Sequence, residues 1–399
     1  MASRVTDLGP GRSPSALLAA LHERSVVAGV PGPAGFIGDW LGGDAAIIPS
    51  VDVRAGVRPP DDPTRFWVGY LAYPDRLAEA ALPAVVGGVS PDVLTHEGGR
   101  WFHHDATGSS CPDWLRACVS GDLNPPPTRA WSTRWTTPPR APHDAAIRSC
   151  LEAIAAGEVY QACVCTRFTG HLTGRPVDFF VAGVESMRPR KAAYVSGDWG
   201  AVASFSPETY LHVHDRTVTS SPIKGTVPSG ADPTSLLSSV KDVAENVMIV
   251  DLVRNDLGRL AVPGSVTVPE LLAVHPAPGV WHLVSTVAAT LPDDVGNDAL
   301  IEATFPPGSV TGTPKIRART LLQGWETSAR GVYCGAVGIA TPDGDLDLNV
   351  AIRTVEITPD GTTALGVGGG ITIDSDPDRE WQECLDKAAS IISMTSSAS

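Results

Sequence analysis

Several features that would place this chain in other protein classes are missing from its sequence. No uninterrupted apolar run reaches the roughly 18 residues of a membrane-spanning helix, and the early run ALLAAL is too short for the apolar core of a signal peptide. The net charge of −14 argues against nucleic acid or an acidic membrane as the main partner. None of the seven cysteines forms a CxxC pair, and their odd number suits reduced thiols. We therefore expect a soluble, cytoplasmic protein.

The remaining composition is that of a globular protein, with 43% hydrophobic residues in 399, enough for one large domain or two ordinary ones. The Pro-rich stretch LNPPPTRAWSTRWTTPPRAP at 123–142 separates two parts of the chain that differ in their sequence patterns. Residues 1–138 hold short strand-like runs such as RFWVGYLAYP and DAAIIPSVDV, whereas residues 139–399 have clear helical and strand periods. The mixture of hairpins and helices predicts an α+β fold with largely antiparallel sheets.

Within the second part, the periodicity predicts individual elements. Residues 143–172 read as a helix, a turn and an apolar strand from about Tyr160, and residues 236–260 as one long helix. Residues 330–357 read as two strands joined by a turn at 342–344, and residues 363–373 as a strand rich in glycine. An amphipathic helix is expected over 376–395.

Two carboxylate pairs lie on the two long predicted helices. Asp242 and Glu245 are three residues apart and share a helix face, and Glu380 and Glu383 repeat this spacing. Both pairs could form solvated acidic faces. Solvated faces are the commoner outcome, but two features weigh towards a metal site: Glu245 borders the apolar run NVMIVDLV, and Glu383 follows GVGGGITIDSD, where backbone can approach a ligand closely. Two such pairs would suit Mg²⁺, which binds a few carboxylates and keeps positions for water and substrate.

Three further positions combine polar groups with special surroundings. FPPGSVTGTPKIRA, residues 305–318, leads into a helix near Lys315 whose first N–H groups favour an anion, although an ordinary strand-to-helix turn is the commoner explanation of such a pattern. Arg353 lies in the apolar run NVAIRTV, read as a strand, and needs a carboxylate partner or an anionic ligand. His282, in GVWHLVST, is either a satisfied core residue or part of a site.

The ordered motifs of this chain resemble those of the chorismate-utilising enzymes. The resemblance rests on PIKGT, AENVMIVDLVRNDLGR, GVWHLVSTV, FPPGSVTGTPKIRA, YCGAVGI, LNVAIRT and GVGGGITIDSD…EWQECLDKA, and is dense from about residue 140 to 392. It implies one intertwined α/β-sandwich domain of two large antiparallel sheets flanked by helices. Residues 1–138 would form an N-terminal subdomain of that sandwich and residues 139–399 the chorismate-binding catalytic region, with the Pro-rich stretch as a crossing loop.

The resemblance also implies roles for the acidic residues. Glu245 and Glu383 match direct Mg²⁺ ligands, and Asp242 and Glu380 match supporting positions that act through water. The metal would hold the ring carboxylate of chorismate.

The same comparison implies a set of substrate-binding residues. Tyr333 and Arg353 match residues that hold the enolpyruvyl carboxylate, and His282 matches a residue beside the reacting ring. The remaining matches are small or motif residues around the substrate: Ser309, Gly312, Lys315 and Gly370.

Three positions favour the aminodeoxychorismate synthase branch of the family. Lys224 of PIKGT stands where anthranilate and isochorismate synthases usually carry alanine, and matches a proposed nucleophile; an apolar setting such as Ile223 would lower the pKa of a lysine and free its electron pair. Glu208 of SPE matches the general acid that expels the C4 hydroxyl. Gln161 replaces the lysine that activates water in isochorismate and salicylate synthases.

The resulting expectation is an enzyme that converts chorismate and ammonia to 4-amino-4-deoxychorismate, for 4-aminobenzoate, folate or specialised metabolism. No segment reads as a fused glutaminase, so a separate glutaminase subunit is expected to supply the ammonia. Two alternatives stay open at this point: anthranilate synthase component I, and a non-catalytic chorismate-binding subunit.

Overall fold

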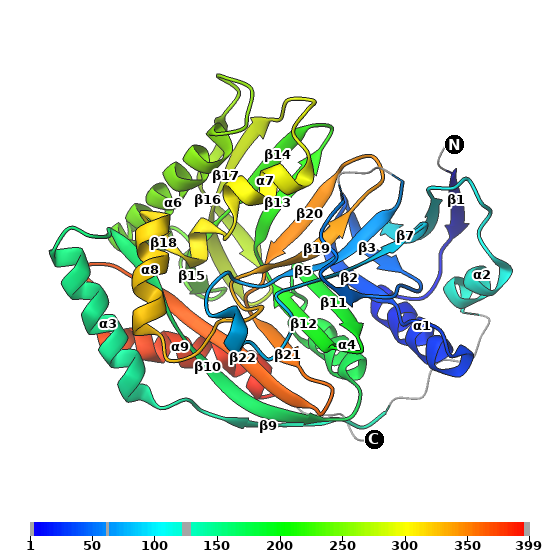
Figure 1. The fold of residues 1–399 in the computed structure, drawn as a ribbon, viewed down its shortest axis with the longest axis horizontal. Helices are drawn as coiled ribbons and strands as arrows, with labels where there is room; N and C mark the ends of the chain where they lie inside the picture. The colour runs from blue at the N-terminus through cyan, green and yellow to red at the C-terminus, as the bar shows by residue number, and fades with distance from the viewer. Residues whose placement is uncertain (1–3, 61–63, 122–128, 395–399) are drawn as a thin grey trace.

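The structure, a computed structural model, describes residues 4–60, 64–121 and 129–394. Two antiparallel sheets form the molecule (Figure 1). Within these residues, the larger sheet, called sheet A, has twelve strands and the smaller, sheet B, has ten. This arrangement confirms the predicted α+β class and the two-sheet sandwich.

Sheet A contains strands from both ends of the chain. Its spatial order is β1 (Arg4–Gly9), β8 (Arg100–Asp105), β7 (Asp92–Glu97), β3 (Gly43–Ile48), β2 (Ala34–Trp40), β11 (Lys191–Gly197), β12 (Gly200–Ser206), β21 (Thr354–Ile357), β22 (Thr362–Ile371), β10 (Gln161–Thr173) and β18 (Gly312–Thr313), with β9 (Ser132–Thr136) beside β10.

Sheet B likewise mixes early and late strands. Its order is β15 (Ile223–Pro228), β17 (Val280–Thr290), β14 (Thr217–Ser221), β13 (Thr209–His214), β20 (Leu346–Val350), β19 (Ala336–Ala340), β5 (Phe66–Leu71), β6 (Val85–Ser90) and β4 (Arg54–Ala55), with β16 (Thr267–Ala277) beside β17. Because β2 pairs with β11 and β5 with β19, both sheets run across the predicted boundary at residue 138. That boundary stays an interpretation, and part of the Pro-rich stretch lies outside the described residues.

The helices lie mostly on the outer faces of the sheets. They are α1 (Pro14–Ala28), α2 (Asp113–Ser120), α3 (Arg140–Ala155), α4 (Pro176–Met187), α5 (Ser235–Ser238), α6 (Val240–Gly258), α7 (Asn297–Thr304), α8 (Lys315–Trp325) and α9 (Pro377–Ile392), with short 3₁₀ turns η1 (Leu77–Glu79) and η2 (Gly308–Val310). None of the helices in the described ranges is both long and apolar enough to cross a membrane.

Strand alternation explains how sheet A is covered on two sides. Along β11, Ala192 and Tyr194 point into the core shared with α1, α4 and α9, whereas Ala193 and Val195 point into the core shared with sheet B. Successive side chains of a strand point to opposite faces, so a strand buried on both sides reads as a continuous apolar run. Figure 1 shows α1 and α4 along the outer side of β2, β11 and β12.

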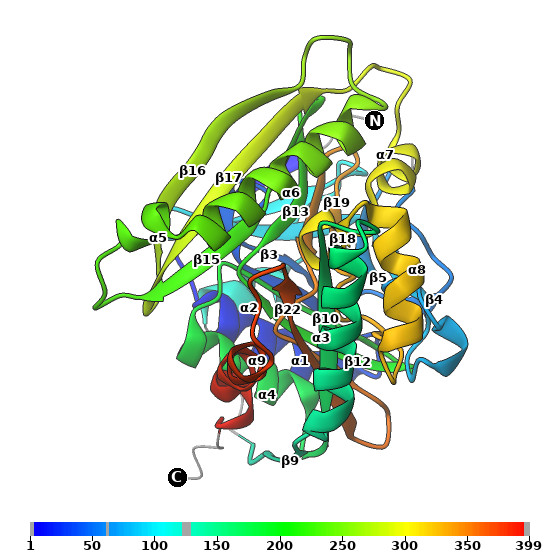
Figure 2. The ribbon, with the colours of Figure 1, turned by 90° about the vertical axis from the view of Figure 1, so that its left-hand side faces the viewer.

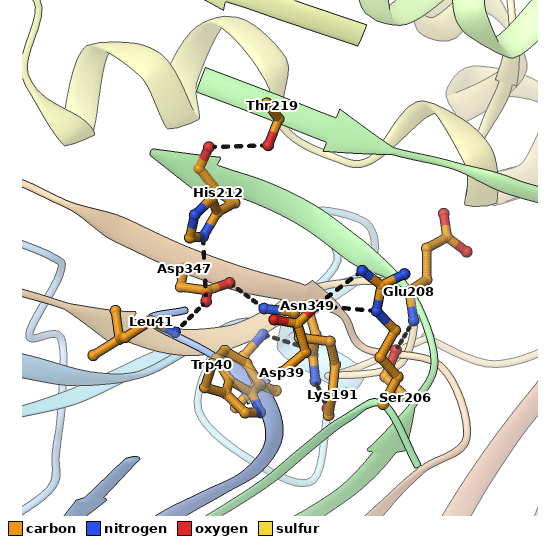
Figure 3. Close-up of polar contacts among 12 residues, drawn as sticks. Asp39, Trp40, Leu41, Lys191, Ser206, Glu208, His212, Thr219, Asp347 and Asn349 are labelled. Atoms are coloured by element: carbon orange, nitrogen blue, oxygen red, sulfur yellow. Dashed lines mark hydrogen bonds and ion pairs between the residues drawn. The ribbon is translucent and has the colours of Figure 1, made fainter. Parts of the chain in front are cut away.

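A buried ion pair joins the two sheets between β11 and β20. Lys191 Nζ donates to Asp347 Oδ1 at 2.6 Å, both side chains are at most 2% exposed, and the ammonium lies 4.4 Å from the centre of the Trp40 ring. The Leu41 amide donates to the other oxygen of Asp347 at 2.9 Å, and His212 lies 3.4 Å from it (Figure 3). The network therefore satisfies a carboxylate that would otherwise be costly to bury.

Most of the predicted elements after residue 139 are present. The helix and strand expected over 143–172 are α3 and β10, the glycine-rich strand is β22, and the final helix is α9. The prediction for Arg353 was wrong, because β20 ends at Val350 and β21 starts at Thr354. Arg353 lies in the connection with a φ of +50°, outside the β region, although its carbonyl still accepts from the Phe205 amide at 3.0 Å.

Candidate active site

The glycines of β22 form the floor of the site. Polar side chains from other elements approach their backbone closely. A Cβ on Gly370 would lie 2.3 Å from Gln161 Nε2 and 2.9 Å from Glu245 Oε2. A Cβ on Gly369 would lie 2.9 Å from Glu380 Oε2 and 3.6 Å from Glu383 Oε1. Any larger residue would displace these polar groups, so the run GVGGG is explained by close approach rather than by backbone freedom.

Two helices carry the four predicted carboxylates, and three of these reach the floor. Figure 2 shows α6 crossing β15 and β17, and α9 beside β22. Asp242 and Glu245 come from the first turns of α6, whose N-cap Ser239 accepts a hydrogen bond from the Asp242 amide. Glu380 and Glu383 come from the first half of α9. Glu245, Glu380 and Glu383 thus reach the glycines of β22 from two separate helices, whereas Asp242 lies against Gly225 of β15.

Lysine side chains lie among these carboxylates. Lys241 donates from Nζ to Glu380 Oε1 at 2.8 Å and lies 3.8 Å from Glu245 Oε1. Lys387 lies 2.6 Å from Glu383 Oε1 and donates to the Gly368 carbonyl. Burial raises the pKa of Glu245; for Glu383 burial acts in the same direction, but the Lys387 ammonium outweighs it and the pKa is lowered.

A β-bulge directs Lys224 into the site. The register of β15 on β17 shifts between Ile223 and Thr226, and Gly225 has a φ of +87°. A bulge of this kind re-aims a side chain. Lys224 Nζ donates to the Ser309 carbonyl at 2.9 Å and lies 3.8 Å from Glu245 Oε2. The expected apolar setting is therefore incomplete: the side chain is only 11% exposed, but its amine contacts polar groups.

Glu208 reaches the same place from the start of β13. Its amide is anchored by the Ser206 hydroxyl at 3.2 Å, and Figure 3 shows its carboxylate pointing away from that anchor. The residue is 4% exposed, and burial raises the pKa of its carboxyl group to about 7, although Ser309 and Lys224 oppose the shift. A carboxylic acid with this pKa is half protonated near neutral pH, which suits a general acid.

His282 and Arg353 are two further predicted site residues. His282 is buried on β17, where its Nδ1 lies 2.9 Å from Thr226 Oγ1. Burial and the positive charge of Arg353 lower its pKa to about 4, so the imidazole is neutral at neutral pH. In the described part of the chain, no hydrogen bond or ion pair reaches the Arg353 guanidinium. A cation that is mostly withdrawn from solvent and lacks a protein counterion is well placed for an anionic ligand.

The remaining predicted residues fall into two groups. Gln161, Ser309 and Tyr333 are buried, and Gln161 Oε1 has no hydrogen-bond partner. Tyr333 packs over Gly366 of β22, where a Cβ would meet its ring at 2.2 Å.

Gly312 and Lys315 serve the surrounding structure. Gly312 has a φ of +139° and lies against the Gln161 backbone, so a larger residue would be strained there. Lys315 Nζ donates to Asp256 Oδ2 at 2.5 Å and to the Thr304 carbonyl at 2.6 Å. Its ammonium is thus occupied by the protein, and its predicted role beside a bound anion stays a prediction.

Sequence reasoning missed Lys241, Lys387 and Asp256. The first two stand four residues from Glu245 and Glu383, a spacing typical of ion pairs on one helix face, and this signal could have identified them. No local pattern connects Asp256 to Lys315, which is 59 residues away.

The four predicted carboxylates are side chains of the type that binds Mg²⁺. Glu380 Oε2 is buried without a hydrogen-bond partner and faces Gly369, as expected of an oxygen that awaits a cation. Carboxylate oxygens are the ligands that Mg²⁺ prefers. Across the described ranges, however, no three acidic, His or Cys side chains converge into a complete metal site, and Lys241 contacts both Glu245 and Glu380. Metal binding would therefore require these side chains to rearrange.

Comparison with known proteins identifies the family. The chorismate binding enzyme family matches residues 58–393. Aminodeoxychorismate synthase component 1 of Salmonella typhimurium is 39% identical over 272 residues, which are 66% of this chain and 59% of that protein. The chain thus matches less than two thirds of the length of this relative.

Solved structures share the fold. Anthranilate synthase component I from Streptococcus pneumoniae has a TM-score of 0.72 at 25% identity and covers 91% of this chain and 90% of its own. The menaquinone-specific isochorismate synthase MenF of Escherichia coli has a TM-score of 0.74 at 19% identity, covering 98% and 95%. The glycine floor, the two carboxylate-bearing helices and the family match over most of the chain lead to one conclusion: this chain belongs to the chorismate binding enzyme family.

Proposed function

We propose that this chain catalyses the amination of chorismate at C4, giving 4-amino-4-deoxychorismate. The observation that carries the proposal is that Lys224 and Glu208 both lie near Ser309: its carbonyl accepts from Lys224 Nζ at 2.9 Å, and Glu208 and Ser309 line one cavity. A nucleophile and a general acid at one residue suit a reaction in which one group adds as another departs. The name of the Salmonella relative, aminodeoxychorismate synthase component 1, supports the same activity.

The first step forms a bond from Lys224 Nζ to C2 of the ring. As the ring double bond shifts, the C4–O bond breaks and Glu208 gives its proton to the departing hydroxyl, which leaves as water. Ammonia then adds at C4, the double bond shifts back, and the lysine amine is expelled from C2. The enolpyruvyl group is kept throughout, so 4-aminobenzoate would need a further lyase.

Other residues would bind the substrate or prevent a competing reaction with water. Arg353, which has no protein counterion in the described structure, would hold the enolpyruvyl carboxylate with Tyr333. Mg²⁺ bound by Glu245 and Glu383, with Asp242 and Glu380 in support, would neutralise the ring carboxylate. Gln161 cannot accept a proton at neutral pH, so water attack at C2 lacks a base.

Product identification tests the proposal. The purified chain is incubated with chorismate, Mg²⁺ and an ammonium salt at high pH, and the products are separated and identified by mass. We expect aminodeoxychorismate with the enolpyruvyl group retained. Anthranilate with release of pyruvate would instead support the anthranilate synthase alternative, which the shared fold of the Streptococcus pneumoniae enzyme keeps open. Binding without turnover would favour a non-catalytic subunit.

The metal and the partner need separate measurements. Glu245→Gln and Glu383→Gln should each raise the Mg²⁺ concentration needed for half-maximal rate, and wild-type dependence in both variants would refute the metal assignment. The component 1 name of the relative also supports a glutaminase partner for this chain. The chain alone should use ammonium salts and leave glutamine unchanged; consumption of glutamine by the chain alone would contradict the two-subunit proposal.

A further inference from the structure

Lys241 bridges the two helices that carry the predicted metal ligands. Its Nζ donates to Glu380 Oε1 on α9 at 2.8 Å and lies 3.8 Å from Glu245 Oε1 on α6. Glu380 and Glu245 are almost fully buried, whereas the Lys241 side chain is 33% exposed. The lysine is therefore the most solvent-accessible of the three side chains, so its ammonium group can move into water more readily than either carboxylate.

Glu380 uses only one of its oxygens in this contact. Oε2 is buried without a hydrogen-bond partner in the described structure and faces Gly369, beside Glu383 Oε1. A buried carboxylate oxygen normally has a donor or a cation. The carboxylate thus presents one oxygen to an ammonium group and the other to the site.

The charges around the floor of the site are nearly balanced. The carboxylates of Asp242, Glu245, Glu380 and Glu383 are accompanied by the ammonium groups of three lysines: Lys224, Lys241 and Lys387. Without these lysines the four carboxylates would attract a divalent cation more strongly and would repel an anion. Such interactions are strong in a partly buried site, where the effective dielectric constant is well below that of water.

We propose that Lys241 is a tethered competitor for the divalent cation, a role that goes beyond the proposed function and rests on its metal site. Its ammonium occupies the position between Glu245 and Glu380, and a divalent cation must displace it to use these oxygens. Lys241 thereby lowers the affinity for the metal and keeps the carboxylate surface acceptable to an anionic substrate in the metal-free protein. The bond broken is the ion pair with Glu380, and the freed side chain moves into solvent.

A positioning role would have the opposite sign. If Lys241 instead held Glu380 in the geometry that the metal needs, its removal would weaken metal binding. A role confined to folding would leave metal affinity unchanged. The sign of the change in affinity therefore distinguishes the three roles.

The test uses Mg²⁺ alone, without chorismate, and two readouts that do not depend on activity. Isothermal titration gives the apparent Kd, and the melting temperature is followed as a function of Mg²⁺ at constant ionic strength. For Lys241→Gln we expect Mg²⁺ binding at least about 10-fold tighter than in wild type, a lower melting temperature without Mg²⁺, and a larger increase when it is added. Lys241→Arg keeps the positive charge and should retain the weak affinity.

Arg379→Gln is the matched control. Arg379 is exposed on α9, next to Glu380, and its substitution changes the net charge by the same amount without touching the site. We expect its Mg²⁺ affinity to stay within about 2-fold of wild type, because exposed charges are screened by salt.

Each outcome decides the matter. Mg²⁺ binding that Lys241→Gln leaves unchanged or weakens overturns the inference alone, as does an equal gain in Arg379→Gln. No Mg²⁺ binding to wild type or to Lys241→Gln overturns the metal site of the proposed function and this inference with it. Should Lys241→Gln fail to fold, Lys241→Arg with tighter Mg²⁺ binding than wild type would refute competition by charge.

Discussion

Glu208→Gln removes the ionisable group from the most perturbed carboxyl of the site while keeping its shape. Burial raises the pKa of Glu208 in the folded protein to about 7, so the native state binds a proton over a range in which the unfolded chain, near 4.5, has lost it. A raised folded pKa means that the stabilising contribution is complete below pH 4.5 and is lost as the pH rises through about 7. Glutamine does not titrate, so the variant keeps the stability that wild type loses.

The size of the effect follows from the two pKa values. At about 1.4 kcal/mol for each pKa unit, the interval from 4.5 to about 7 corresponds to roughly 3 kcal/mol. We therefore expect the free energy of unfolding of Glu208→Gln, relative to wild type, to rise by about 3 kcal/mol between pH 4 and pH 8. Burial also raises the pKa of Glu356 to about 7, but the stability that this residue loses over the range is the same in both proteins and cancels in the difference.

The assay is urea unfolding of both proteins at half-unit pH intervals, without Mg²⁺ or chorismate. Glu152→Gln, on the exposed surface of α3, is the control and should show a flat difference. The same Glu208→Gln protein should lose roughly 10²- to 10⁴-fold in amination rate, the usual contribution of a general acid. A flat stability difference would refute the desolvation argument, and a near wild-type rate would remove Glu208 from the mechanism.

Three further perturbations test separate parts of the reasoning. Lys224→Ala should still bind chorismate but lose at least about 10³-fold in aminodeoxychorismate formation, measured by product mass, and a near wild-type rate would leave Lys224 a spectator. Arg353→Met should raise KM for chorismate about 10- to 100-fold and yet raise the melting temperature of the free protein, because an unpaired buried charge is removed; a lower melting temperature would indicate a structural partner. Asp347→Leu should lower the free energy of unfolding by about 3–5 kcal/mol by leaving Lys191 buried and unpaired, and the added change Lys191→Met should recover most of it; no recovery would mean that the ion pair itself is not the cause.

Much of the fold could be read from local patterns. The apolar spacing of the last predicted helix and the alternation along β10 depend only on neighbours in the chain, and they identify α9 and β10. The single helix predicted over 236–260 is instead divided into α5 and α6 at Ser239, where ψ is 104°. The glycine run of β22 likewise indicated close approach before its neighbours were known. The order of the motifs was sufficient to predict the family.

Local patterns gave wrong predictions at two residues whose surroundings depend on a local feature of the backbone. The apolar run around Arg353 predicted a strand, but that residue has a positive φ and lies between β20 and β21. Lys224 was expected among apolar neighbours, whereas the bulge at Gly225 turns its amine to Ser309 and Glu245. Neither a bulge nor a left-handed residue leaves a clear trace in the period of the surrounding sequence.

The sequence by itself therefore determined the elements and which residue types the site contains, because those depend on short-range periodicity and composition. Only the tertiary structure decided which of them meet. Lys224 reaches Ser309 across 85 residues and Lys241 reaches Glu380 across 139, and both contacts depend on strand register and helix packing that no short segment specifies. The same packing withdraws Glu208 from water and raises its pKa to about 7, so the acid strength of this side chain is a property of the folded molecule.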